Sequence, residues 1–262
     1  MGNGADTMGI VRQRREKIVD ILREREEADI GLLVKKLNSS EATIRRDLNA
    51  LEMDDRIIRV RGGARLINPE SLVTKTFEQK RQIMAAEKER IAKKAAEFVE
   101  PGMVIAMDSG TTIWRVAAAL KEKGSLQIIT SALAVVEELG SIDDMAIHLI
   151  GGKFRLSNLD FVGPMSISAV SGFHADVAII AVDALIAGKG TYGNDEDSAA
   201  LTRAIGKCAE KRIVVADHTK IGARGYCQIL SNTEIDILIT DTGINPELVK
   251  ELLKESFELI MA

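Results

Sequence analysis

Residues 39–52, SSEATIRRDLNALE, decide how the first part of this 262-residue chain is interpreted. Their apolar side chains, Ile44, Leu48 and Leu51, recur at helical spacing and therefore face a small core. The rest of the helix surface carries hydroxyl, guanidinium and amide groups, on Thr43, Arg45, Arg46 and Asn49. A helix with this surface can enter the major groove of DNA and contact phosphates and base edges.

The sequence on either side predicts a winged helix-turn-helix. Helices are expected over residues 11–26, 30–37 and 41–53, and Ser40 is expected to be the N-cap of the third. In RIIRVRGGARLI (56–67), alternating apolar residues flank Gly62-Gly63, which predicts a hairpin that adds arginine contacts to DNA. The predicted DNA-binding residues are Ser40, Thr43, Arg45, Arg46, Asn49, Arg59, Arg61 and Arg65. The alternative is a three-helix bundle with a solvated basic face.

Charge is distributed unevenly along the chain. Residues 11–67 hold 14 Lys and Arg against 11 Asp and Glu, a net charge of +3, whereas the remainder carries −7 and the whole chain −4. This asymmetry indicates a polyanionic partner for the N-terminal part. The two cysteines and three scattered histidines favour neither a disulfide framework nor a metal site, so we expect no metal and no cofactor.

No apolar run approaches the roughly 18 residues that a membrane span needs. The N-terminus also lacks the apolar core of a signal peptide. Together with two thiols in no recognisable pairing pattern, these features favour a cytoplasmic protein.

From about residue 87 the pattern changes to short apolar runs separated by helical stretches. The runs are MVIAM (103–107), LQIIT (126–130), AIHLI (146–150), VAIIAV (177–182), RIVVAD (212–217) and IDILIT (235–240). Runs that are apolar on both faces and alternate with helices predict a parallel sheet covered on both sides, that is, a doubly wound α/β domain.

Small and polar residues follow several of these runs, where an open α/β sheet binds its ligands. The segment DSGTT (108–112) forms a loop at a helix N-terminus, which offers free N–H groups and a positive dipole to an anion. The alternative is an ordinary strand-to-helix turn. The predicted ligand-binding residues are Asp108, Ser109, Gly110, Thr111, Thr112, Ser131, Gly151, Gly152, Lys153, Asp183, Glu196, Arg203, Asp217 and Lys220. Together they favour a pocket for a phosphorylated polyol.

The N-terminal pieces resemble the DNA-binding domain of the DeoR family of bacterial transcription regulators. The resemblance is carried by RREKIVDIL (14–22), TIRRDL (43–48) and RVRGGA (59–64). It continues through DSGTT, the Gly-Gly at 151–152, the Gly-Pro at 163–164 and ADHTKIG (216–222), which resemble the DeoR-type sensor domain. That domain is related to sugar-phosphate isomerases such as ribose-5-phosphate isomerase and generally senses phosphorylated sugars or their metabolites.

Two positions depart from the family pattern. Thr130-Ser131-Ala132 stands where the family often has Thr-Asn-Ser, and Ala184-Leu185 follow Asp183 where the family often has Gly. The first change removes an amide donor. Both changes affect which effector can be bound.

A sugar-phosphate isomerase with an appended domain is the rival hypothesis. Isomerisation needs a general base over a C–H bond, and in the related isomerases this base is a Glu directly after an Arg. Here Ala204 follows Arg203 in our alignment, so the base is absent and we expect a sensor, not an enzyme.

The sequence therefore predicts three segments. Residues 10–66 form the winged helix-turn-helix, 67–87 a linker, and 88–262 an α/β domain for effector sensing and oligomerisation. We expect a transcription regulator, of the repressor type common in the family, that acts on carbohydrate metabolism genes. Its partners are operator DNA and a phosphorylated sugar or related metabolite. Two-fold operators require paired DNA-binding domains, so a dimer or tetramer is expected.

Overall fold

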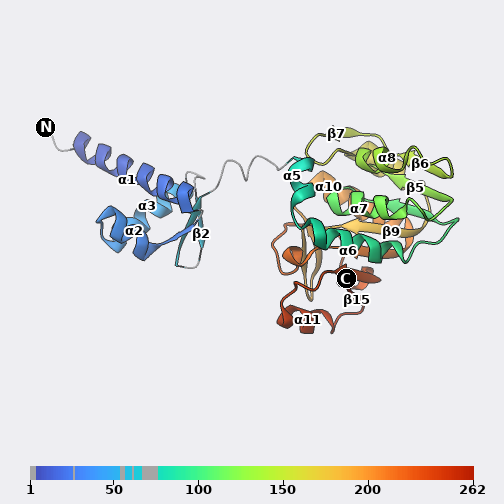
Figure 1. Ribbon diagram of the computed structural model, residues 1–262. Helices are drawn as coiled ribbons and strands as arrows, with labels where there is room; N and C mark the ends of the chain where they lie inside the picture. Colours follow the sequence, from blue (N-terminus) through green and yellow to red (C-terminus); the bar gives the residue numbers. More distant parts are fainter. Residues whose placement is uncertain (1–3, 26, 54–56, 61, 67–75) are drawn as a thin grey trace. The chain divides into compact units, whose positions relative to one another are not determined.

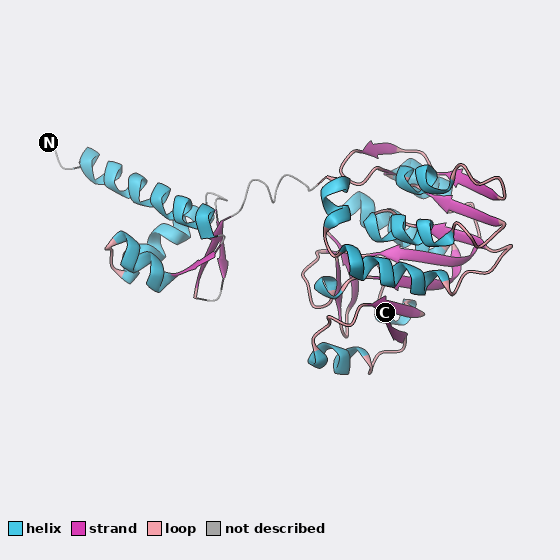
Figure 2. Cartoon of the chain, viewed as in Figure 1, coloured by secondary structure: helices cyan, strands magenta, loops and turns pink. Residues whose placement is uncertain are grey.

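A computed structural model describes residues 4–25, 27–53, 57–60, 62–66 and 76–262 (Figure 1). The chain divides into two compact units, Met1–Lys75 and Thr76–Ala262. Helices dominate the described part of the first unit, and a sheet flanked by helices forms the second (Figure 2). No described helix has the length and apolar content that crossing a bilayer would require.

The N-terminal unit packs three helices against a small sheet. Its elements are α1 (Gly4–Arg25), β1 (Glu27–Asp29), α2 (Ile30–Leu37), α3 (Glu41–Met53), β2 (Ile57–Val60) and β3 (Gly63–Leu66). The predicted hairpin is confirmed, because β2 and β3 pair antiparallel around Gly62 at φ 86°. The strand β1, which the sequence did not predict, pairs with the other side of β3.

Local capping explains why the second and third helices occupy the predicted ranges. Asp29 caps α2 by accepting a hydrogen bond from the Leu32 amide, and Asn38 ends the helix in the left-handed conformation. Ser40 is the N-cap of α3, since its Oγ accepts a bond from the Thr43 amide at 3.3 Å. The three helices bury a common core that includes Leu33, Ile44 and Leu48.

The second unit is built on a seven-stranded parallel sheet of order β15-β14-β12-β9-β4-β5-β6. All six predicted strands lie in it. They are β4 (Val104–Met107), β5 (Leu126–Thr130), β6 (Met145–Leu149), β9 (Ala175–Ala181), β12 (Ala209–Val215) and β14 (Ile237–Thr240). The edge strand β15 (Glu258–Met261) was not predicted.

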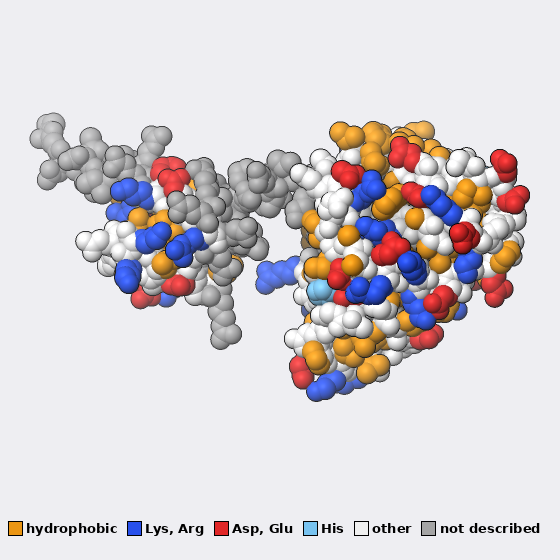
Figure 3. All heavy atoms as spheres, viewed as in Figure 1, with side chains coloured by type: hydrophobic (Ala, Val, Ile, Leu, Met, Phe, Trp, Pro, Cys, Tyr) orange, Lys and Arg blue, Asp and Glu red, His pale blue; other side chains and the backbone are white. Residues whose placement is uncertain are grey.

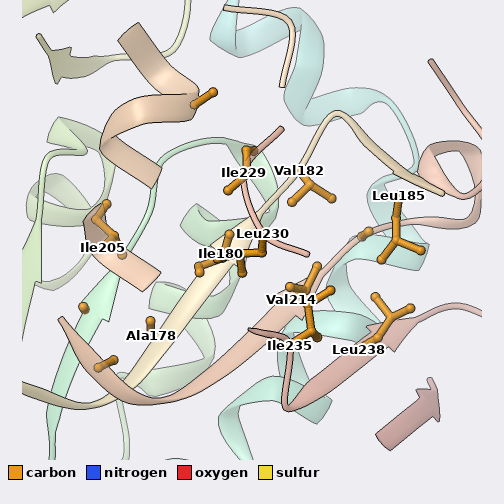
Figure 4. Close-up of a cluster of buried hydrophobic side chains, with 14 of the residues drawn as sticks. Ala178, Ile180, Val182, Leu185, Ile205, Val214, Ile229, Leu230, Ile235 and Leu238 are labelled. Atoms are coloured by element: carbon orange, nitrogen blue, oxygen red, sulfur yellow. The ribbon is translucent and has the colours of Figure 1, made fainter. Parts of the chain in front are cut away.

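Helices cover both faces of this sheet, as the doubly wound fold requires. Side chains of β4 alternate between two cores: Ile105 and Met107 join one, and Ala106 joins the other. One core contains apolar residues of α6 (Ala85–Ala96), α7 (Thr111–Leu120) and α8 (Leu133–Leu139). The other core, shown in Figure 4, contains residues of α9 (Pro164–Val170), α10 (Glu196–Lys207) and α11 (Pro246–Leu252).

Short strands and 3-10 helices complete this unit. A two-stranded sheet joins β7 (Lys153–Arg155) and β8 (Asp160–Val162). A three-stranded sheet joins β10 (Ala184–Ile186), β11 (Gly190–Gly193) and β13 (Cys227–Gln228). The 3-10 helices are η1 (His218–Lys220) and η2 (Asn232–Glu234).

The start of the second unit differs from the prediction. Residues 76–87, which the sequence assigned to the linker, belong to this unit and contain α5 (Phe77–Gln82) and the start of α6. Thr76 begins α5 with a capping box, in which it exchanges hydrogen bonds with Gln79. The side chain of Phe77 is buried, so the segment packs as part of the domain.

Candidate functional site

The exposed surface of α3 carries the predicted DNA-contacting groups. Arg45 pairs with Glu41 one turn away at 2.7 Å, whereas Arg46 makes no ion pair with any described residue. The hydroxyls of Ser40 and Thr43 lie 2.8 Å apart at the start of the helix. Figure 3 shows Lys and Arg side chains gathered on the visible face of this unit, over the region of α2 and α3. Among the described side chains, Lys35, Lys36, Arg45 and Arg46 are exposed there.

A buried carboxylate fixes α3 against α1. Asp47 is 1% exposed and accepts hydrogen bonds from Arg14 at 2.5 Å and Arg15 at 3.1 Å. Each arginine neutralises charge that burial would otherwise make costly. The basic pair at 14–15 therefore holds the predicted recognition helix in place.

The remaining predicted DNA-binding residues are only partly described. Asn49 lies exposed on α3. Arg59 and Arg65 belong to β2 and β3, and their side chains are not described. Arg61 lies outside the described residues.

In the second unit, the DSGTT segment forms a tight connection between β4 and α7. Gly110, at φ 107°, is the N-cap of α7 and provides no side-chain cap. The first amides of α7 therefore lack a capping side chain, which leaves them available to an anion. Ser109, Thr111 and Thr112 are all buried around this turn. We call residues 109–112 the cradle.

Three lysines, Lys80, Lys88 and Lys220, lie close enough to one another beside the cradle for their charges to interact. Lys88, 6% exposed, places its ammonium 3.1 Å from Thr111 Oγ1 and 3.1 Å from the carbonyl oxygen of Lys80. Burial lowers the pKa of Lys88 to about 8; the charge of Asp217 opposes this shift and the charge of Lys220 contributes to it. Burial and the charge of Lys220 also lower the pKa of Lys80. None of the three ammonium groups forms an ion pair with a described residue, and the charges of Asp217 near Lys88 and of Asp183 and Asp160 near Lys80 only partly offset the effect of burial on their pKa values.

Acidic groups lie on the other side of the cradle. Asp108 is buried at the end of β4 and accepts bonds from Thr202 Oγ1 at 3.1 Å and from the Ala181 amide at 3.3 Å. Burial raises the pKa of Asp108 to about 7; hydrogen bonds from Ser109 and Thr202 oppose this shift and the charge of Asp160 contributes to it. Asp160 in turn accepts a bond from Ser109 Oγ at 2.6 Å.

An arginine from the β7–β8 hairpin organises these carboxylates. Arg155 contacts Asp160 through two nitrogens, at 2.9 and 2.6 Å. Its third nitrogen donates to Asp195 at 2.8 Å, at the N-cap of α10. Asn158, in the same hairpin, accepts a bond from Lys80 Nζ at 2.6 Å. The hairpin thus contacts both α10 and α5 beside the cradle.

One buried hydroxyl in this region has no hydrogen-bond partner among the described residues. Ser131 Oγ, at the end of β5, is unpaired, although the residue is 1% exposed. The Ser131 carbonyl accepts a bond from the Phe161 amide, next to Asp160. A buried hydroxyl normally finds a partner, so a ligand that reaches this point would satisfy it.

Several predicted residues have structural contacts of their own. A Cβ on Gly152 would lie 2.1 Å from Ser166 Oγ and 2.7 Å from the Val162 carbonyl oxygen, so this glycine permits close packing. The guanidinium of Arg203 donates to the backbone carbonyls of Gln228 and Ile229. Asp217 accepts bonds from Thr219 and so caps η1.

The other predicted residues lie at the surface of the unit. Asp183 is exposed and accepts a bond from the Asn194 amide at 2.9 Å, while its charge partly opposes the lowering of the Lys80 pKa by burial. Glu196 is exposed in the first turn of α10. Gly151 and Lys153 are exposed beside β7, and no described contact connects them to the cradle.

Sequence reasoning missed four residues of this site: Lys80, Lys88, Arg155 and Asp160. Lys80 lay in the segment taken for a linker, although the Thr76–Gln79 capping box marks a helix start there, and Lys88 was the first residue of the predicted α/β domain but was not assigned to the site. The hairpin residues carried no local signal, because the tertiary fold alone brings β7 and β8 to the end of β4. Among the described residues, no His, Cys, Asp and Glu cluster could hold a metal ion.

Comparison with known proteins adds independent findings. A family model for the DeoR-like helix-turn-helix domain matches residues 14–70, and one for the DeoR C terminal sensor domain matches 83–242. The chain is 31% identical over 229 residues to the glycerol-3-phosphate regulon repressor of Escherichia coli (strain K12). The aligned residues cover 87% of this chain and 90% of that protein.

A second relative has a similar coverage. The lactose phosphotransferase system repressor of Lactococcus lactis subsp. lactis is 30% identical over 242 residues, 92% of this chain and 94% of that protein. Among solved structures, ribose 5-phosphate isomerase A from Neisseria gonorrhoeae aligns with a TM-score of 0.39 and 21% identity, over 52% of this chain and 54% of that one.

Proposed function

Because the chain belongs to the DeoR family of transcription regulators, we propose that it represses carbohydrate metabolism genes and is controlled by a phosphorylated sugar or a related metabolite. As a family member it is a DNA-binding transcription regulator. The proposal assigns operator binding to the first unit and effector binding to the cradle of the second.

Operator recognition is assigned to α3 and the β2–β3 hairpin. The exposed guanidinium of Arg46, free of any ion pair with described residues, is the group most available to a phosphate or a guanine edge. Arg45 must first leave Glu41. Two-fold operators need two such helices, so the functional form is a homo-oligomer, a dimer or a tetramer, acting in the cytoplasm.

The observation that carries effector binding is the buried ammonium of Lys88. It lies at the N-terminus of α7, where the helix dipole also favours negative charge. Keeping this group charged in the unliganded protein is costly, as its lowered pKa of about 8 indicates. A phosphate bound at the cradle would give Lys88 a direct ion pair, add negative charge beside Lys80 and Lys220, and accept bonds from the α7 amides.

The polar groups beyond the lysines suit the hydroxyls of the sugar. Asp183 lies close enough to Lys80 to affect its pKa and retains oxygens that can accept bonds from hydroxyls. Ser131 Oγ is free to donate or accept. The names of both relatives described above, a glycerol-3-phosphate regulon repressor and a lactose phosphotransferase system repressor, agree with an effector of this class.

Catalysis is the competing proposal, and the carboxylates of the site argue against it. A general base must be free to take a proton from carbon. Asp160 accepts hydrogen bonds from Arg155 and Ser109. Asp108 is buried and accepts hydrogen bonds from Thr202 and a backbone amide. Neither buried carboxylate is positioned as a free base, and Ala204 follows Arg203 where the related isomerases have their Glu, so we propose that the ligand is sensed and not converted.

Thermal unfolding of the full chain against sugar phosphates and the matching free sugars tests the proposal. Stabilisation by the phosphorylated compounds alone, lost in Lys88→Met and retained in Lys93→Met, is the expected result. Lys93 is an exposed lysine of the same helix and provides the matched control. NMR of the incubated ligand should show no product. Stabilisation by no compound, or turnover of one, would refute the corresponding part of the proposal.

A further inference from the structure

The helix α5 is the first element of the second unit after the residues that connect it to the DNA-binding unit (Figure 1). It spans six residues and buries a single apolar side chain, that of Phe77. A helix this short is unstable by itself. Its position therefore depends on what holds it to the rest of the domain.

Polar contacts from α6 and α7 hold the last turn of α5. The carbonyl oxygen of Lys80 accepts a bond from Lys88 of α6 at 3.1 Å, and that of Arg81 accepts one from Arg115 of α7 at 3.3 Å. The guanidinium of Arg81 lies 4.0 Å from the centroid of the Trp114 ring, a cation–π contact. Cations thus bind the carbonyl groups at this helix end, where the Lys80 carbonyl also accepts a bond from the C-cap amide of Ile83 at 3.3 Å.

Two of the residues in these contacts also belong to the cradle. Lys88 bridges the carbonyl of Lys80 and the hydroxyl of Thr111, so one buried ammonium connects the end of α5 to the start of α7. An ammonium has three protons, and the two described bonds leave one for an anion. The side chain of Lys80 likewise extends from α5 to the hairpin residue Asn158 beside the cradle. An anion at the cradle would therefore strengthen the hold on α5.

We propose that α5 transmits the state of the effector site to the DNA-binding unit, with Lys80 and Lys88 as the coupling residues. This inference rests on the proposed function, since it assumes an anionic effector at the cradle. With the anion bound, α5 is held firmly and the tether between the units ends at Thr76. Without the anion, α5 detaches more often and the tether lengthens.

The change in tether length is large enough to affect DNA binding. Residues 76–83 are eight residues, and such a segment spans up to about 27 Å when extended. The local concentration of one DNA-binding unit at the second half-site depends on the length of chain that connects it to its partner. Release or capture of α5 would therefore alter the affinity of an oligomer for a two-fold operator.

Amide hydrogen exchange on the full chain tests the first step, with inorganic phosphate as the ligand and chloride at equal ionic strength as the control. Phosphate should slow exchange of the α5 peptide by about fivefold or more, the lower end of typical coupling between sites. Lys88→Met should speed that exchange without phosphate and remove the response to it. Lys93→Met, with the same change at an exposed position of α6, should behave as the unmodified chain.

Fluorescence gives a second readout, because Trp114 is the single tryptophan of the chain. Arg81 lies over its ring, so detachment of α5 should change the emission. The emission should follow phosphate concentration with the same midpoint as the exchange protection. Lys80→Met, which keeps Lys88, should weaken the response of both signals.

Operator affinity tests the second step. The double variant Thr76→Ala/Gln79→Gly removes the capping box of α5 and leaves the cradle unchanged. It should keep a reduced phosphate-induced thermal stabilisation, because coupling between α5 and the cradle is reciprocal, but lose most of the effect of phosphate on operator affinity. If phosphate stabilises the protein while α5 exchange or the operator response of this variant is unaltered, the inference is wrong and the proposed function stands. If phosphate produces no stabilisation and no change in α5, both are wrong.

Discussion

Substitution Lys88→Met should make the unliganded protein more stable while it abolishes effector binding. Burial lowers the pKa of Lys88 from 10.5 to about 8. At about 1.4 kcal/mol per pKa unit, keeping the charge at pH 7 costs ~3 kcal/mol. Methionine removes that cost but also the two hydrogen bonds to Thr111 and Lys80, at about 1 kcal/mol each. The net gain is ~1 kcal/mol, or about 2–4 °C in melting temperature for a unit of this size.

The pH dependence supplies the decisive signature. Between pH 8 and 10.5 the unfolded chain still holds the Lys88 proton that the folded chain has lost. Rising pH therefore relieves the cost of folding, and the free energy of unfolding of the unmodified chain should increase through this window. In Lys88→Met this increase should be absent.

Urea unfolding followed by circular dichroism, at several pH values with and without the stabilising sugar phosphate, measures all three effects. A ligand at 100 times its dissociation constant should stabilise the unmodified chain by about 2.7 kcal/mol and the variant by nothing measurable. Lys93→Met should change stability by less than ~0.5 kcal/mol. A loss of more than ~2 kcal/mol in unliganded Lys88→Met, or full ligand stabilisation of this variant, would refute the assignment of Lys88 as a buried charge awaiting an anion.

Three further outcomes are expected. Arg46→Ala should weaken operator binding in a gel-shift assay by about 1–3 kcal/mol, and Arg45→Ala by less, because Arg45 already pairs with Glu41; equal affinity of all three proteins would remove α3 from the interface. Asp108, whose pKa burial raises to about 7, holds a proton in the folded chain that the unfolded chain loses above about pH 4. Stability should therefore fall as pH rises from 4 to 7, and Asp108→Asn should flatten this slope in urea titrations; an unchanged slope would contradict the assignment. Gly152→Ala, which places a Cβ 2.1 Å from Ser166 Oγ, should lower stability by about 1–3 kcal/mol, whereas Gly151→Ala, whose Cβ meets no atom within 4 Å, should change it little; matching melting curves would show that the backbone tolerates the side chain.

Local signals account for the parts of the fold that the sequence predicted well. Helices α2 and α3 have the predicted bounds, because Asp29, Asn38 and Ser40 define their ends by hydrogen bonds to adjacent backbone groups or by backbone conformation. The six internal strands were recognisable as apolar runs between helices. The strand β15 carries the short apolar run 259–262, but it lies at the edge of the sheet with both of its ends exposed, and the prediction did not include it.

The candidate effector site could be predicted only where topology determines it. Parallel strands place Asp108 and Ser131 at the same edge of the sheet, and the sequence predicted both. Lys80 reaches the site because α5 folds back onto the domain, and Arg155 because a hairpin does. Both residues depend on contacts between segments far apart in the chain, which periodicity does not reveal.

The buried Asp47 has a consequence for protein engineering. Transfer of the recognition segment 40–52 into a related regulator would carry along a carboxylate that two arginines of another helix neutralise. In a recipient without basic residues at the positions of Arg14 and Arg15, that carboxylate would be buried uncompensated, at a cost of several kcal/mol. To alter DNA specificity, α1 and α3 should therefore be transferred together. A chimera that receives both helices should fold, whereas one that receives α3 alone should not.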